Sequence, residues 1–225
     1  MSRELVDKKN KTQLHLIGSS SEVSKSLAGY YSDKNIIFYD REAELFDNPS
    51  YFVRQLKADV THVIVYISSI LRAKRISDQE VNELTETFNI NCWVPCSLLE
   101  LLNNMSNLRF RFIYMSSESA KKGSFDGAYA ISKSATEKFI TEMRLKNTSS
   151  SCLAIAPSTI EDARMTVERR DKDRLESYRT QHPKQRFITS AEIAHLLHTI
   201  IEMDLDYLTN TVLEVNGGKF ARSSS

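Results

Sequence analysis

Short apolar runs alternate with longer amphipathic stretches along most of this chain. Six apolar runs have the length and composition of buried strands: residues 13–18, 35–39, 61–67, 108–115, 152–156 and 211–215. Apolar residues at helical spacing predict helices over 19–31, 49–58, 78–103, 127–146 and 190–202. Pro95 either interrupts the third of these helices or begins a second one. Such alternation implies right-handed crossovers and a parallel sheet that is covered on both faces.

The pattern predicts an α/β protein with a single Rossmann-type domain, a doubly wound parallel sheet with helices on both faces. The domain is expected over residues 13–221, after a flexible segment 1–12 and before a disordered tail 222–225. Residues 161–186 stand apart, because they carry eight basic and six acidic side chains and few apolar ones. This segment is either a solvated helix or loop, or a functional lid. Doubly wound sheets bind ligands at the carboxyl ends of their strands.

Composition narrows the class of partner. The 225 residues include 30 Lys and Arg against 29 Asp and Glu, so the net charge of +1 gives no reason to expect nucleic acid or acidic membranes. No apolar run has the length of a membrane span, and the polar N-terminus lacks the core of a secretion signal. The three cysteines form no CxxC pair, and no histidine has a metal-like partner. We expect a cytoplasmic protein without a metal site.

Tyr129 and Lys133 are the first candidates for chemistry. Residues four apart share a helix face, so the phenol and the ammonium can approach each other. A nearby Lys⁺ favours the phenolate, which would lower the tyrosine pKa toward the range where proton transfer to a carbonyl is efficient. The spacing is weak evidence by itself, since Tyr30 and Lys34 repeat it. Ser117, at the end of a predicted strand twelve residues before Tyr129, adds a hydroxyl at the same sheet edge.

The region IYMSSESAKKGSFDGAYAISKSATEKF resembles the short-chain dehydrogenase/reductase family, in which a strand ending in Ser-Ser precedes YxxxK by about a dozen residues. Further matches are AIAP, RFITSAEIAHLLHTII and TNTVLEVNGGKFA, so the resemblance spans residues 13–221. It implies that Ser117 bonds the substrate carbonyl, Tyr129 transfers the proton, and Lys133 tunes the tyrosine and holds the nicotinamide ribose. It also implies an Asn that anchors a water. Asn91 fits this role better than Asn89. The simpler alternatives are that Asn91 is an amide satisfied inside a helix and that Ser117 caps the turn after its strand.

The cofactor end matches less well. The family expects TGxxxGxG, whereas Gly18 is followed by Glu22 and Ser24 at the later glycine positions. Asp40 ends the second strand, where a carboxylate accepts the ribose hydroxyls and favours NAD, although it could also be a turn residue. Adjacent Arg41 makes NADP possible. The expected cofactor-binding residues are Gly18, Ser20, Ser21, Glu22, Val23, Asp40, Arg41, Tyr66, Ile67, Ser68, Tyr129, Lys133, Pro157 and Ile160. The run Tyr66-Ile67-Ser68-Ser69 stands where the family has NNAG.

Two functions follow as hypotheses. The first is an NAD(P)-dependent oxidoreductase that acts on a carbonyl or alcohol, with a keto-sugar or similar polar compound as the guess for its substrate. The alternative is a non-catalytic relative that binds a dinucleotide weakly or acts through protein contacts. The resemblance also implies a homodimer or homotetramer built on the helices 78–103 and 127–146. Trp93 is expected in the core, and the expected interface residues are Val94, Leu98, Leu101, Ala135, Phe139 and Met143.

Overall fold

The computed structural model describes residues 12–32, 35–169, 171–203 and 207–221. Six strands form one parallel sheet in the order β2-β1-β3-β4-β5-β6. Their bounds are β1 Thr12–Ile17, β2 Ile36–Tyr39, β3 Thr61–Tyr66, β4 Arg109–Met115, β5 Ser151–Pro157 and β6 Thr211–Val215. The sheet therefore grows outward in two directions from β1 and β3. This reversal of strand order creates the crevice at which doubly wound sheets bind ligands.

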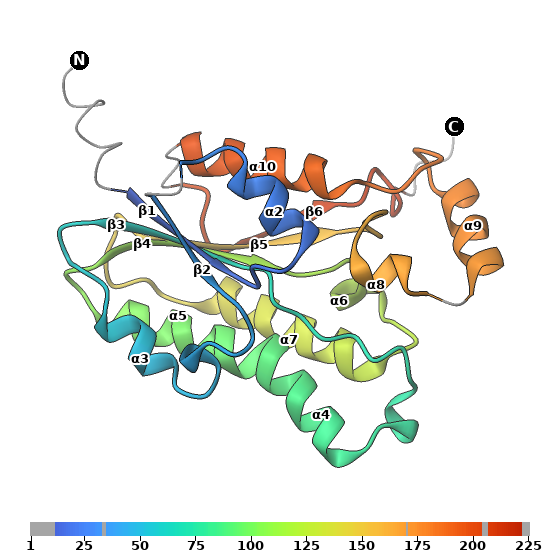
Figure 1. The fold of residues 1–225 in the computed structure, drawn as a ribbon, viewed down its shortest axis with the longest axis horizontal. Coiled ribbons are helices and arrows are strands. Elements are labelled where there is room, and N and C mark those ends of the chain that lie inside the picture. The colour runs from blue at the N-terminus through green and yellow to red at the C-terminus, as the bar shows by residue number, and fades with distance from the viewer. Residues whose placement is uncertain (1–11, 33–34, 170, 204–206, 222–225) are drawn as a thin grey trace.

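Helices cover both faces of the sheet (Figure 1). One face of the sheet packs against α2 (Glu22–Ala28) and α10 (Ser190–Met203). The apolar side chains of these two helices form one core with the side chains on that face of the strands. The other face packs against α3 (Pro49–Arg54), α5 (Val94–Asn104) and α7 (Gly127–Glu142), with α4 (Val81–Phe88) beside them. The predicted doubly wound α/β fold is confirmed. Every predicted strand lies within one or two residues of an observed one.

The predicted helix 78–103 consists of three parts. A π-helical turn, η4 (Asn89–Trp93), joins α4 to α5, and Pro95 lies in the first turn of α5, where its missing N–H costs nothing. The widened turn leaves carbonyl groups to be satisfied from outside the helix. Tyr66 donates to the carbonyl of Ile90 at 2.6 Å, and Tyr114 donates to that of Asn91 at 2.5 Å. Two buried tyrosines from neighbouring strands thus stabilise the turn.

The charged segment 161–186 is largely helical. It contains α8 (Arg164–Val167) and α9 (Lys172–Gln181), which lie beyond the end of the sheet, near the short α6 (Ser119–Lys122) (Figure 1). Arg179 forms ion pairs with Glu161 and Glu176, and its guanidinium lies over the ring of Phe187. A cavity of about 500 Å³ lies between α8 and α9. The sequence pattern did not indicate α6, nor the 3-10 turns η2 (Glu44–Phe46) and η3 (Ile76–Asp78).

Most of the expectations about the two ends of the chain fall outside the described residues. Thr12 begins β1 and so belongs to the domain, while the rest of the expected N-terminal segment and the expected tail 222–225 lie outside the described residues. Lys34 lies outside them as well. Within the described part of the chain, no helix has the length and apolar character needed to cross a membrane.

Candidate active site

The candidate catalytic side chains meet at the carboxyl edge of the sheet. Ser117 follows the end of β4, and Tyr129 and Lys133 lie one turn apart in α7. The hydroxyls of Ser117 and of Ser69, which follows β3, lie close enough to the phenol of Tyr129 to lower its pKa. Only 5% of Tyr129 is exposed, and this burial raises its pKa, although the two serine hydroxyls act in the opposite direction.

Lys133 lies close to the rings of Tyr129 and Tyr114. Its Nζ donates to the carbonyl of Met115 at 2.7 Å and lies 4.5 Å from the ring centre of Tyr114 and 5.9 Å from that of Tyr129. Burial lowers the pKa of Lys133 to about 7, since only 1% of the residue is exposed. The expectation that Lys133 lowers the pKa of Tyr129 stays a prediction. The groups that lower the pKa of Tyr129 here are Ser117 and Ser69.

Asn91 lies fully buried in the π-helical turn. Its side chain accepts from the amide of Ile70 and donates to the carbonyl of the same residue, both at 2.8 Å. Its own carbonyl accepts from Tyr114 and from Thr136, at 2.5 and 2.8 Å. A carbonyl oxygen has two lone pairs, so these two donors use its capacity. Asn91 thereby fixes the segment after β3 against α7, and its role as a water anchor stays a prediction.

Asp126 is a residue that sequence reasoning missed. It is 1% exposed and caps α7, where its Oδ1 accepts from the amide of Tyr129 at 3.1 Å. It also accepts from the amide of Arg72 at 2.7 Å and from the side chain of Gln79 at 3.0 Å. An Asp directly before the amphipathic stretch at Gly127 is an N-cap signal that could have found it. Asp126 ties the start of the Tyr129 helix to the loop that carries Ser69.

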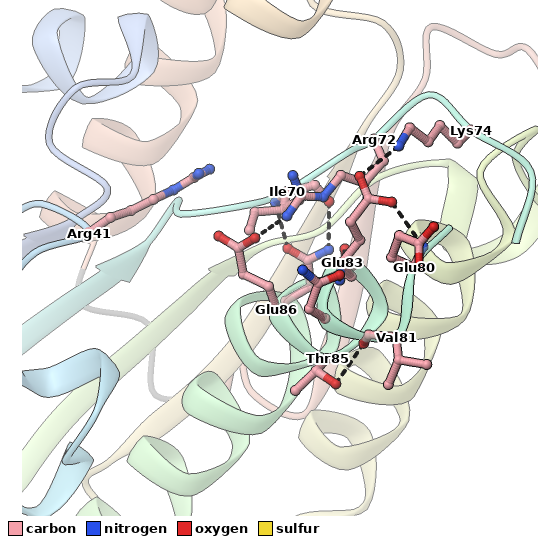
Figure 2. A network of polar contacts seen from close by, with 12 residues as sticks. Arg41, Ile70, Arg72, Lys74, Glu80, Val81, Glu83, Thr85 and Glu86 are labelled. Atoms are coloured by element: carbon pink, nitrogen blue, oxygen red, sulfur yellow. Dashed lines mark hydrogen bonds and ion pairs between the residues drawn. The ribbon is translucent and has the colours of Figure 1, made fainter. Parts of the chain in front are cut away.

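The loop after β3 is also fastened to α4. Figure 2 shows Arg72 reaching Glu86 and Lys74 reaching Glu83, and the second of these ion pairs measures 2.7 Å. Glu80 and Glu83 form a capping box at the start of α4. The side chain of Glu83 therefore holds both a lysine of the loop and the first amide of its own helix. These surface contacts fix the loop that follows Ser69 against α4, the helix that leads into the π-helical turn.

The turn after β1 has the backbone that a dinucleotide cradle needs. Gly18 has φ +97°, and a Cβ at this position would lie 2.6 Å from the amide nitrogen of Ser68. Ser24, which replaces the last glycine of the family pattern, is fully buried and donates to the carbonyl of Gly18 at 2.8 Å. The serine therefore fastens the turn. Ser21 caps α2, whose first turn also contains Glu22 and buried Val23, and Ser20 is exposed. These residues fit a pyrophosphate at the start of α2.

Asp40 and Arg41 lie at the end of β2, beside this turn. The Oδ1 of Asp40 accepts from the amide of Glu42 at 3.1 Å, so the carboxylate also serves as a turn residue, as one of the two readings expected. Arg41 donates to the carbonyl of Ser69. Figure 2 shows the side chain of Arg41 pointing toward Ile70, the next residue of that loop. The side chains of Asp40 and Arg41 are both exposed at the crevice where the strand order reverses.

The other expected cofactor contacts occupy less uniform positions. Tyr66 is fully buried in the core with its hydroxyl on Ile90, so only its backbone could face a dinucleotide. Ile67 and Ser68 are buried beside the Gly18 turn, where both amides donate to the carbonyl of Ile17. Pro157 ends β5, and Ile160 pairs with Ile188 at the base of the charged segment. Pro157 and Ile160 thus lie at the carboxyl edge but on its other half.

Comparison with known proteins agrees with this architecture. A family model described as enoyl-(acyl carrier protein) reductase matches residues 51–219. A short-chain dehydrogenase/reductase from Brucella melitensis, described as a glucose/ribitol dehydrogenase, has 19% identity and a TM-score of 0.77, and the match covers 95% of this chain and 98% of that one. Aldohexose dehydrogenase from Thermoplasma acidophilum has 17% identity and a TM-score of 0.73, over 97% and 98%.

A third solved structure, a small-chain dehydrogenase in complex with NADPH, has 19% identity and a TM-score of 0.73, over 93% of this chain and 98% of that one. No curated protein matches this sequence. The matches lend no support to the alternative of a non-catalytic relative. The family model spans most of the chain and the solved structures share its fold. The chain therefore belongs to the short-chain dehydrogenase/reductase family of NAD(P)-dependent oxidoreductases.

Proposed function

We propose that this oxidoreductase interconverts a carbonyl group and an alcohol in a small polar molecule, with Tyr129 as the proton-transfer group. The observation that carries the proposal is the proximity of the Tyr129 phenol and the Ser117 hydroxyl at the carboxyl edge of the sheet. A phenol and a serine hydroxyl that lie side by side can both reach one carbonyl oxygen. Ser117 would donate to that oxygen and hold it, while Tyr129 would give or take the proton.

The nicotinamide dinucleotide, when bound, supplies or accepts the hydride. Gly18, Ser21, Val23 and the first turn of α2 would hold its pyrophosphate, and Asp40 and Arg41 would lie near its adenosine ribose. We propose a preference for NAD because Asp40 presents a carboxylate there, with NADP admitted through Arg41.

Lys133 has a positioning role in this proposal. Its ammonium is held by the carbonyl of Met115 and the face of the Tyr114 ring, which fixes its position relative to Tyr129. From there it can hold a ribose hydroxyl and return a proton to the phenol. Because the site is dry, its charge acts strongly on the tyrosine once Lys133 is protonated. Asn91 keeps Ile70 in place, and with it the segment that carries Ser69.

The substrate class proposed is a polar carbonyl compound such as a keto-sugar. The helices α8 and α9 carry many charged side chains, and the cavity between them is lined by residues such as Glu161, Lys172 and Arg179. Such a lining favours a substrate with hydrogen-bonding groups over an apolar one. Two of the solved structures with this fold are described as sugar or polyol dehydrogenases.

The test is a pair of tyrosine variants assayed on ketones and keto-sugars with both cofactors. Tyr129→Phe removes one hydroxyl and should lower turnover by about two to four orders of magnitude, with dinucleotide affinity nearly unchanged. Tyr30→Phe is the matched control. Tyr30 is 44% exposed, stacks on His198 and lies in the turn after α2, so its loss should leave turnover unchanged. Near-full activity of Tyr129→Phe on any substrate would refute the role proposed for this residue.

A further inference from the structure

A cluster of three charged side chains lies directly beside Ser117. Glu118 is the next residue, and only 4% of its side chain is exposed. Its Oε1 accepts from Lys122 of α6 and from Lys219, which follows β6, the latter at 2.8 Å. The amide of Glu118 donates to the carbonyl of Pro157 at 2.9 Å. Three separate segments of the carboxyl edge therefore meet at this carboxylate.

The cluster is not balanced in charge. Two ammonium groups share one carboxylate oxygen, which leaves a net charge of +1. The neighbouring Lys121 and Glu214 form their own ion pair at 2.5 Å and add nothing to this excess. Burial lowers the pKa of Lys122, whereas the carboxylate of Glu118 acts in the opposite direction.

The cluster is also incomplete in its hydrogen bonds. The second oxygen of Glu118, Oε2, is buried and has no hydrogen-bond partner among the described residues. A buried carboxylate oxygen without a donor is unfavourable, so an ion pair built only for stability would satisfy it. The lysines, in contrast, remain accessible, since 35% of the Lys122 side chain and 27% of that of Lys219 are exposed.

The cluster lies within electrostatic reach of the catalytic centre. The charge of Glu118 raises the pKa of Tyr129, and Glu118 is covalently joined to Ser117. Since the amide of Glu118 bonds Pro157 of β5, the two ammonium groups on Glu118 lie at the same carboxyl edge as Ser117, on the side toward β5 and β6. Partly dehydrated ammonium groups bind carboxylate or phosphate oxygens through charge-assisted hydrogen bonds.

We propose that Lys122 and Lys219, held by Glu118, form a subsite for an anionic group of the substrate, a carboxylate or a phosphate, beside the carbonyl that reacts. The inference rests on the proposed function, because it takes Ser117 and Tyr129 as the place of the reacting carbonyl. It narrows the substrate from polar carbonyl compounds to those that bear a negative charge. Glu118 is a positioning residue in this arrangement.

The test measures binding without turnover, on protein saturated with oxidised dinucleotide, by calorimetry. Two matched pairs of ketones serve as probes: acetoacetate with its methyl ester, and dihydroxyacetone phosphate with dihydroxyacetone. At least one anionic probe should bind roughly tenfold or more tightly than its neutral partner. The two pairs distinguish a carboxylate from a phosphate. Equal affinities within both pairs, or no binding of either anion, would overturn the proposal.

Variants locate the preference. Lys122→Gln and Lys219→Gln should each reduce the preference for the anionic probe to less than about threefold, whereas Lys219→Arg should keep it. Lys121→Gln is the matched control, since Lys121 lies on the same helix but pairs with Glu214. A preference that survives both glutamine variants would place the anion elsewhere. Tyr129→Phe should bind the probes like the unchanged protein, so this result and the turnover result can fail independently.

Discussion

Single residues at this site hold conformations that the family pattern alone does not predict. Ser24, in the place of a glycine, tightens the turn at Gly18 by donating to its carbonyl. Tyr66, in the place of an asparagine, leaves the cofactor side of the sheet and bonds the π-helical turn. Each departure creates a new hydrogen bond in the protein. At these two positions, the turn after β1 and the π-helical turn are held by side-chain hydrogen bonds that the family motif does not predict.

His15 and His62 form a buried pair whose protonation affects stability. His15 Nε2 lies 2.9 Å from His62 Nδ1, and burial, together with the charge of His62, lowers the pKa of His15 from 6.5 to about 3. Between these pH values the unfolded chain binds a proton that the folded one excludes. The contribution of neutral His15 to the free energy of unfolding is therefore fully present above pH 6.5. Below this pH the free energy of unfolding falls by about 1.4 kcal/mol per pH unit. Urea unfolding at pH 7.5, 6 and 5 measures this slope.

The variant His15→Gln supplies the control, because its amide can bond both His62 and Tyr39 without titrating. The loss of stability between pH 6.5 and 5 should be smaller in this variant than in the unchanged protein. An identical slope in the two proteins would assign the acid sensitivity to other groups.

At the scale of elements, the start of α7 decides where Tyr129 lies. Asp126→Ala would leave the amides of Arg72 and Tyr129 and the side chain of Gln79 without their acceptor. We expect the unfolding free energy to fall by about 2–4 kcal/mol, and turnover to fall as well because Tyr129 loses its register with Ser117. Chemical denaturation and a substrate assay measure the two effects.

Asp78→Ala is the comparison for this variant, since Asp78 lies in the same region and accepts from Ser77 at the surface. Its stability should change by less than about 0.5 kcal/mol. If Asp126→Ala were as stable and as active as Asp78→Ala, the cap would have no part in placing Tyr129.

The elements were also the level at which sequence reasoning succeeded most fully. Hydrophobic periodicity predicted all six observed strands, because buried parallel strands are apolar throughout. It missed α6 and the π-helical turn, since neither is set by a local pattern: the turn depends on Tyr66 and Tyr114, which reach it from distant strands. Ser117, Tyr129 and Asn91 were found from spacing and resemblance, whereas Asp126 and Glu118 act through contacts across the fold.

At the scale of the whole molecule, the surface corrects the expected interface. Val94 and Leu98 are fully buried within the single chain and cannot contact a second copy. Trp93, expected in the core, is instead 68% exposed, and Ile131 on α7 is 53% exposed. These two exposed side chains on the same pair of long helices are better candidates for a contact between subunits.

We expect a dimer or tetramer in solution, built on these helices. The double variant Trp93→Ser and Ile131→Ser should shift the mass measured by light scattering toward the monomer at micromolar concentration. Tyr207→Ser is the control, because Tyr207 is also fully exposed but lies outside both helices. A monomeric mass for the unchanged protein would contradict the assembly.

The order of the strands has a consequence for the protein during its synthesis. The turn at Gly18 and the crevice between β1 and β3 need only the first third of the chain, and Ser117, Tyr129 and Lys133 follow in the middle. Lys219 comes after β6, the last strand, and meets Glu118 across 101 residues. The residues of the crevice and of the proton-transfer pair therefore leave the ribosome before Lys219 does. Under the proposed subsite, the growing chain would select its substrate only after β6 has joined the edge of the sheet.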